Sequence, residues 1–201
     1  MKFTLTLVVL TASVLSTVVT AQTNTKYPFR LRAWRDSRFN NPLPLSIYVE
    51  LDPTTGDAII NRTAGYTGFD SYLDPTPEEG TLHKNGTGEM GYLFPLHGMD
   101  TDLPHYQLRY SRGIPKIAGV LWRNFTTVGR GCGGHCGGAT LDYDIGGDRG
   151  YGEWYIIPKK KNAHGKKGDR HVWYLRWIGV KFLNETVDIP DGGYSVYLWK
   201  N

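Results

Sequence analysis

Alternation between apolar and polar residues is the sequence feature that most constrains how this chain folds. In "HVWYLRWIG", Trp173, Leu175 and Trp177 alternate with Tyr174 and Arg176. Because successive side chains of a strand point to opposite faces, a period of two predicts strands with one buried face. The same alternation occurs at 27–34, 42–51, 105–111 and 139–145, and weaker strand patterns occur at 57–61, 91–95, 118–125, 152–158, 180–184 and 194–199.

Turn sequences such as "PTTGD", "NGTG" and "PDGG" separate these segments, and no apolar stripe of helical period reaches ten residues in the chain after residue 21. About ten to twelve short strands with one apolar face each must stack as two sheets or close on themselves. We therefore expect an all-β fold with little or no helix, arranged as a compact antiparallel β-sandwich. A β-trefoil-like barrel is the alternative. Residues 22–201 form a single expected domain.

The first 21 residues have the anatomy of a secretory signal peptide. Lys2 precedes an uncharged apolar run at 3–19, and small residues precede a cleavage site after Ala21. A membrane anchor is the alternative, but a run of about 17 residues is at the short end for spanning a bilayer. We expect removal of residues 1–21, a secreted, extracellular protein, and no membrane span.

Four Asn-x-Thr sequons support export and predict surface glycosylation. Their asparagines are Asn61, Asn85, Asn124 and Asn184.

Both cysteines, Cys132 and Cys136, lie in "GCGGHCGG" on either side of His135. A disulfide suits an oxidising export route, and the intervening glycines allow so tight a loop. A metal site with His135 and a redox pair are the alternatives, but zinc would need further ligands and redox pairs favour C-x-x-C spacing. The formal dinucleotide fingerprint in "GRGCGG" precedes a strand pattern rather than the required helix. We expect no cofactor.

The net charge of the chain does not favour a nucleic-acid partner. The chain has 23 Lys and Arg, of which Lys2 lies in the leader, against 19 acidic residues, which leaves the mature protein near +3. So mild a charge predicts no nucleic-acid partner. The loop after 158 concentrates cations and is a candidate anion-binding loop, with a solvated hairpin as the simpler interpretation. Its cations are Lys159, Lys160, Lys161, Lys166, Lys167 and Arg170.

Acidic residues follow one strand pattern. Asp142 and Asp144 point the same way and, with Asp148, are a weak calcium candidate or an acid/base pair, although alternate acids on a solvent face are ordinary. We expect no catalytic residues and no resident metal.

Several aromatic residues could form a sugar-stacking platform: Trp154, Trp173, Trp177, Tyr197 and Trp199. Trp173 and Trp177 lie on the strongest apolar face, so core packing is the favoured interpretation for them. Trp34 and Tyr174 lie on more polar faces and are the better candidates for a glycan-stacking platform.

The layout of the chain resembles a family of small secreted fungal (ascomycete-type) proteins with a single domain of unknown function. The likeness rests on Phe29-Arg30-Leu31, "LSIYVELDPTTGDAII", "KNGTGEMGYLFPL", "GEWYIIP", "HVWYLRW" and "YSVYLW". This resemblance implies a fungal, secreted, all-β protein and brings no catalytic residues.

The sequence predicts a non-catalytic secreted glycoprotein that presents loops to cell-wall glycans, host glycans or a surface protein. One alternative is a secreted polysaccharide-acting hydrolase with carboxylates from Asp142, Asp144 or Glu153. Another is an effector or antigen that engages a host protein.

Overall fold

The computed structural model describes residues 27–34, 46–61, 68–74, 80–96, 104–130, 138–144, 152–159, 172–179 and 193–200. Within these ranges every helix or strand assigned is a strand. No helix in this part of the chain is long and apolar enough to cross a membrane. The strands are β1 (Phe29–Trp34), β2 (Ser46–Tyr48), β3 (Glu50–Leu51), β4 (Ala58–Asn61), β5 (Asp70–Leu73), β6 (Leu82–Lys84), β7 (Met90–Leu96), β8 (His105–Ser111), β9 (Phe125–Arg130), β10 (Gly138–Tyr143), β11 (Gly152–Pro158), β12 (Val172–Gly179), β13 (Tyr194–Ser195) and β14 (Tyr197–Lys200).

The strands pair antiparallel along one path, in the order β13-β11-β12-β8-β7-β6-β5-β1-β14-β10-β9. Beside this path, β2 pairs with β1, and β4 pairs with β12 and β3. The expectation of an all-β, antiparallel, sandwich-like fold is confirmed.

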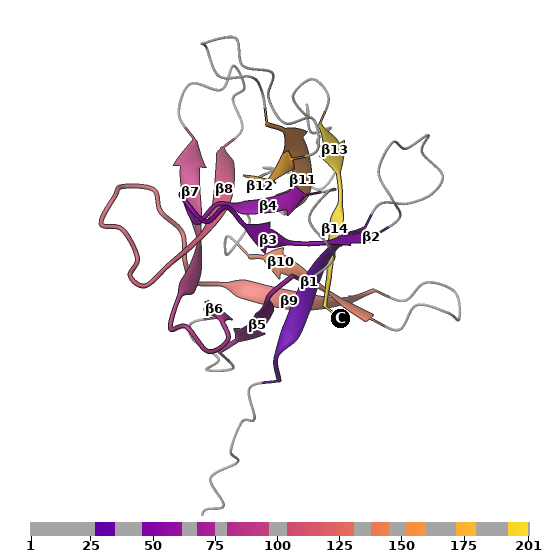
Figure 1. Ribbon diagram of the computed structural model, residues 1–201, viewed down its shortest axis with the longest axis horizontal. Coiled ribbons are helices and arrows are strands. Elements are labelled where there is room, and N and C mark those ends of the chain that lie inside the picture. Colours follow the sequence, from indigo (N-terminus) through magenta and orange to yellow (C-terminus); the bar gives the residue numbers. More distant parts are fainter. Residues whose placement is uncertain are drawn as a thin grey trace, which may run out of the picture.

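Two segments make the corners where one sheet turns into the other. In β1, Phe29 and Arg30 pair with β5, whereas residues 31–34 pair with β14. The C-terminal segment does the same: β13 pairs with β11, and β14 pairs with β1 and β10. Strands that switch sheets are a known way to build such corners. Figure 1 shows β13 and β14, in yellow, as one continuous run on the side opposite the β7–β8 hairpin.

The core lies between the inward faces of these strands. The alternation at 171–179 is confirmed, because Trp173, Leu175 and Trp177 are all buried. Burying one large apolar side chain contributes about 1.5–3 kcal/mol, so this face supplies much of the stability. The same cluster contains the buried leucines Leu31, Leu82, Leu93, Leu108, Leu141, Leu175 and Leu198.

The opposite face of β8 is polar but also buried. The side-chain amide of Gln107, only 2% exposed, donates hydrogen bonds to the carbonyl oxygens of Ala58, Leu108 and Leu175. His105 Nδ1 and the Tyr155 hydroxyl share a hydrogen bond of 2.7 Å. Buried polar groups without such partners would destabilise the fold, so these bonds fasten β8 to β4, β11 and β12.

Some strand boundaries differ from the sequence prediction. Residues 118–124 are turn and irregular backbone, with one isolated bridge from Leu121 to Leu93, and the strand begins only at Phe125. Gly119 has φ +81°, a left-handed conformation that interrupts a strand. The predicted run at 42–51 contains a break at Val49, between β2 and β3. The short strands β5 and β6 were not predicted, and the segment expected at 180–184 lies outside the described residues.

Candidate functional site

A pocket of about 110 Å³ lies at the corner formed by β13 and β14. The C-terminal segment leaves β11 after Ser195 and joins β10 at Leu198. Between these two pairings, Val196 donates its backbone N–H to the carbonyl of Trp154 at 2.9 Å. The pocket lies between β10, β11 and the C-terminal segment. It is lined by Thr140, Leu141, Asp142, Gly152, Glu153, Trp154, Ser195, Val196, Tyr197 and Leu198.

Trp154 of β11 connects this strand to β10 beside the pocket. Its side chain is 4% exposed and belongs to the core cluster. The indole Nε1 donates a hydrogen bond of 2.9 Å to the carbonyl of Leu141. Because β10 and β11 have no ladder between them here, this bond from a rigid ring fixes their spacing and therefore the shape of the pocket.

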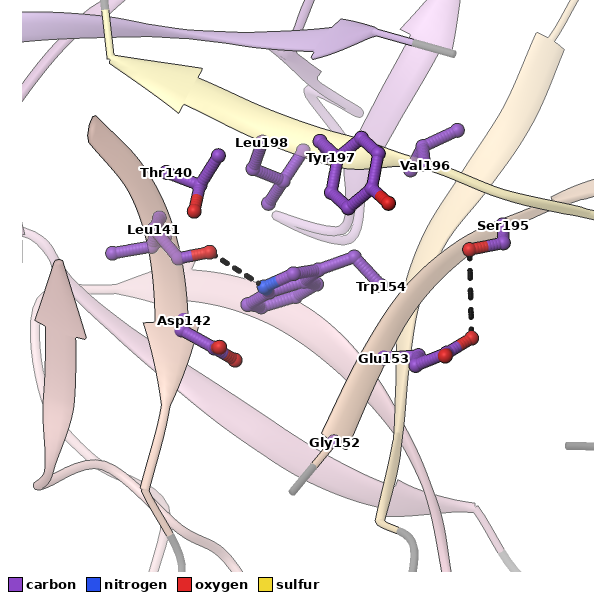
Figure 2. A pocket seen from close by; sticks show the side chains of 10 residues that line it. All are labelled: Thr140, Leu141, Asp142, Gly152, Glu153, Trp154, Ser195, Val196, Tyr197 and Leu198. Atoms are coloured by element: carbon purple, nitrogen blue, oxygen red, sulfur yellow. Dashed lines mark hydrogen bonds between the residues drawn. The ribbon is translucent and has the colours of Figure 1, made fainter. Parts of the chain in front are cut away.

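Two carboxylates lie on either side of that indole, as Figure 2 shows. One is Glu153, which is exposed and accepts a hydrogen bond of 3.5 Å from the Ser195 hydroxyl. The other is Asp142, whose Oδ1 accepts the backbone N–H of Tyr143 at 2.8 Å. Among the described lining residues, no side chain is cationic. The described part of the pocket lining therefore contributes carboxylate and hydroxyl oxygens that can accept hydrogen bonds.

Tyr197, which lines the pocket, belongs to an aromatic pair. Trp34 and Tyr197 are directly opposite each other in the β1–β14 ladder, with ring centroids 6.1 Å apart and planes inclined by 29°. Tyr197 is 36% exposed, although its neighbours Val196 and Leu198 are buried. A half-exposed stacked pair offers an apolar surface held rigid at low cost in side-chain entropy.

The outer face of the sheet extends from this pair across β14, β10 and β9. Asp142 lies opposite Thr126, and Thr140 lies opposite Val128, which is exposed. On the β1 side, the Arg32 guanidinium lies 5.3 Å from the centre of the Tyr48 ring. We call Trp34, Tyr197, Asp142, Glu153 and Ser195 the corner site.

The second predicted platform residue, Tyr174, is on a different sheet from Trp34. It lies on β12, half-buried against Tyr155 and Ile157. Lys159 Nζ is 5.5 Å and the Arg176 guanidinium 5.7 Å from its ring centre. Trp34 and Tyr174 therefore do not form one platform.

The predicted anion-binding loop is described only at Lys159. Its Nζ is 3.2 Å from Asp52 Oδ2. Burial alone would lower the pKa of Lys159, but the hydrogen bonds to Asp52 and Tyr174 outweigh burial and raise it. Five predicted members lie outside the described residues: Lys160, Lys161, Lys166, Lys167 and Arg170.

Two of the four predicted glycosylation sites are exposed. Asn85 begins the turn between β6 and β7, and Asn124 precedes β9 with φ +70°. Asn61 is half-buried at the end of β4, where it pairs with Val172. The fourth, Asn184, lies outside the described residues.

The predicted disulfide and calcium candidates are only partly described. Cys132, Cys136 and Asp148 lie outside the described residues. Within those residues, no three His, Cys, Asp or Glu side chains gather closely enough to hold a metal ion.

Sequence reasoning did not single out Ser195 as a site residue. Tyr197 was among the aromatic residues considered for a sugar-stacking platform, but Trp34 and Tyr174 were preferred. The signal for Tyr197 was present, because it alternates with two aliphatic residues in "SVYLW" and therefore points away from the core. No family model, curated protein or solved structure matches this chain. Function is therefore inferred from the residues of the chain itself.

Proposed function

We propose that the chain is a secreted fungal glycoprotein that binds carbohydrate without chemically altering it, and that the corner site is where it binds. The leader, the four sequons and the resemblance in layout support export and glycosylation. Cell-wall or host glycans are the expected partners.

The observation that carries the proposal is the exposed Tyr197 ring, stacked on Trp34 beside two carboxylates. Sugar rings have apolar C–H faces and polar hydroxyl edges. An aromatic ring packs against the C–H face of a sugar, and carboxylate and hydroxyl oxygens accept hydrogen bonds from the sugar hydroxyl groups. The corner site has both kinds of group where the two sheets meet.

The size of the pocket favours binding at the surface over enclosure. Pockets that engulf a small ligand measure about 300–1,000 Å³. At about 110 Å³, the corner pocket holds part of one sugar ring, and the rest of the glycan would lie outside the pocket, against the exposed Tyr197 ring.

Binding to a glycan array and to isolated fungal cell wall tests this proposal. The secreted protein should bind at least one glycan class, and Tyr197→Ala should weaken that binding about tenfold, because a lost aromatic contact of this kind costs roughly 1–2 kcal/mol. Tyr27→Ala is the matched control, since Tyr27 is 79% exposed and lies outside the site. Binding that is absent, or equal in the two variants, would reject the proposal.

A polysaccharide hydrolase is the second candidate, because Asp142 and Glu153 line the same pocket. Glycoside hydrolysis needs two carboxyl groups across the scissile bond. Reducing-end release from a panel of polysaccharides distinguishes the two candidates. Turnover by the protein that disappears in Glu153→Gln would favour hydrolysis.

A further inference from the structure

The turn between β6 and β7 offers a covalent chemistry that is separate from the corner site. It contains the pair Asn85-Gly86, and every residue from 85 to 88 is exposed. We infer that Asn85, wherever it carries no glycan, converts spontaneously to isoaspartate and aspartate through a cyclic imide formed with the Gly86 nitrogen. The conversion does not depend on the proposed function, and only the protection of Asn85 by a glycan rests on it.

The reaction is an intramolecular displacement at the side-chain amide, which needs no second molecule to bring the reacting atoms together. The backbone nitrogen of Gly86 attacks the side-chain carbonyl carbon of Asn85, and the bond from that carbon to Nδ2 breaks. The proton of the Gly86 N–H leaves with Nδ2 as ammonia, and a succinimide ring remains. Water then opens the ring at either carbonyl, which gives isoaspartate or aspartate. The net reaction consumes water, releases ammonia and needs no oxidant or reductant.

The Gly86 nitrogen is available for this attack. Two neighbouring N–H groups hold the turn: Lys84 donates to the Glu89 carbonyl at 2.9 Å, and Asn85 donates to the Asp70 carbonyl at 2.8 Å. In the described part of the chain, by contrast, the Gly86 N–H donates no hydrogen bond. A methyl group added at Gly86, where φ is +77°, would meet no atom within 4 Å, so the space around this residue is open.

Asn124 provides a comparison within the same chain. It is also an exposed sequon asparagine, with φ +70°. The next residue, Phe125, is only 3% exposed and donates its N–H to the Gly80 carbonyl at 2.8 Å. The nitrogen that ring closure would need is therefore already engaged. Releasing one such bond costs about 1–1.5 kcal/mol, or roughly tenfold in rate, so the structure selects Asn85 over Asn124.

Conversion would change the turn in charge and in its capacity for modification. A carboxylate would replace a neutral amide beside Lys84, whose Nζ lies 2.8 Å from Glu89 Oε2. Loss of Nδ2 would also remove the atom to which a glycan is attached, so a converted chain could no longer be glycosylated at residue 85. A glycan already present would have to leave together with Nδ2, and occupied Asn85 is therefore expected to persist.

Peptide mapping by mass spectrometry of the full secreted protein tests this inference. One preparation is glycosylated, and the other is secreted in the presence of tunicamycin, which leaves the sequons unoccupied. Both are incubated in mildly alkaline water enriched in heavy oxygen, so that only conversion during the incubation carries the label. In the unglycosylated protein Asn85 should convert at least about tenfold faster than Asn124, with isoaspartate among the products. The ratio should narrow in urea, where Phe125 loses its hydrogen bond.

Two glycine variants test the role of the Gly86 nitrogen. Gly86→Ala should slow the conversion of Asn85 several-fold, because a side chain then lies next to the attacking atom. Gly88→Ala is the matched control: Gly88 has φ +69° and open space around it, so the backbone strain is similar while the Asn85-Gly86 pair is kept. A third variant, Thr87→Val, removes this sequon alone and supplies unglycosylated Asn85 in a chain that keeps its other glycans.

The outcomes separate this inference from the proposed function. Asn85 that converts no faster than Asn124 in the folded protein would overturn the inference, and so would aspartate without isoaspartate, which indicates direct hydrolysis of the amide. Equal slowing by Gly86→Ala and Gly88→Ala would overturn it as well. Absence of any glycan from the secreted protein would count against the proposed function and leave the conversion of Asn85 standing.

Discussion

Gly152 is the residue whose replacement tests the packing of the corner most sharply. It begins β11, lines the pocket and pairs with Gly179 of β12. The Trp177 indole lies over it, so a methyl group added at Gly152 would lie 1.8 Å from Trp177 Cζ2. Carbon atoms in contact normally lie about 3.5–4.0 Å apart, which leaves an overlap of roughly 1.7 Å.

The indole has little room to move away. Trp177 is fully buried, and the rings of Tyr106 and Tyr143 lie 5.7 Å and 5.3 Å from it. Overpacking of a dense core costs about 1–3 kcal/mol, and an overlap this large should reach or exceed the upper value. Gly152→Ala is therefore expected to lower the free energy of unfolding by at least about 3 kcal/mol, measured by denaturant titration.

Gly113→Ala is the matched control, because a methyl group there meets no atom within 4 Å and no positive φ forbids it. Alanine restricts the unfolded chain, so this variant should be neutral or stabilised by up to about 1 kcal/mol. The double variant Gly152→Ala/Trp177→Phe should recover about 1–3 kcal/mol relative to the sum of the single variants, since the smaller ring leaves space. Among the described residues, Trp177 Nε1 has no hydrogen-bond partner that the substitution would remove. An unchanged stability of Gly152→Ala, or strict additivity with Trp177→Phe, would refute the reasoning.

Three further predictions concern stability. Gln107→Leu removes the two amide N–H donors that three backbone carbonyls share and should cost about 2 kcal/mol in the same titration; a neutral effect would show that these bonds do not fasten β8. Burial raises the pKa of Tyr155 to about 12, so on raising the pH this tyrosine ionises first in the unfolded chain. Its contribution to the free energy of unfolding is therefore fully present below pH about 10 and is lost as the pH rises toward 12. Tyr155→Phe should flatten the alkaline loss of stability, and an identical pH profile would contradict this. The hydrogen bond from Lys84 lowers the pKa of Glu89, so its contribution is present above pH about 4.3 and lost on acidification below that value. Glu89→Gln should lower the free energy of unfolding by about 0.5 kcal/mol at pH 7 and leave it unchanged at low pH. A difference between variant and parent that is the same at both pH values would argue against a stabilising Lys84–Glu89 ion pair.

The strands with the clearest contrast between their faces could be predicted from the sequence. Segment 171–179 is the best case, because its tryptophans and leucine are buried in the core. The short strands β5 and β6 have four and three residues, too few for alternation to stand out. Alternation also assigns Gln107 to a polar face, but it cannot show that this face is covered.

The corner site depends on contacts between distant segments, so only its parts could be predicted. Trp34, Asp142 and Glu153 were candidates from local pattern alone. These residues lie close together because of the β1–β14 register and because the C-terminal segment pairs first with β11 and then with β10. Local sequence does not encode which strand a distant strand pairs with, so the partnership of Trp34 with Tyr197 required the structure.

The most direct test of the account is to map where a glycan binds on the folded protein. Backbone amide NMR shifts of the secreted protein would be followed during titration with the glycan that binds most tightly on the array. We predict that the largest shifts fall on Trp34, Asp142, Glu153, Ser195 and Tyr197, with β7 and β8 unaffected. Shifts concentrated around Lys159 and Tyr174, or no shifts at saturating glycan, would contradict carbohydrate binding at the corner site.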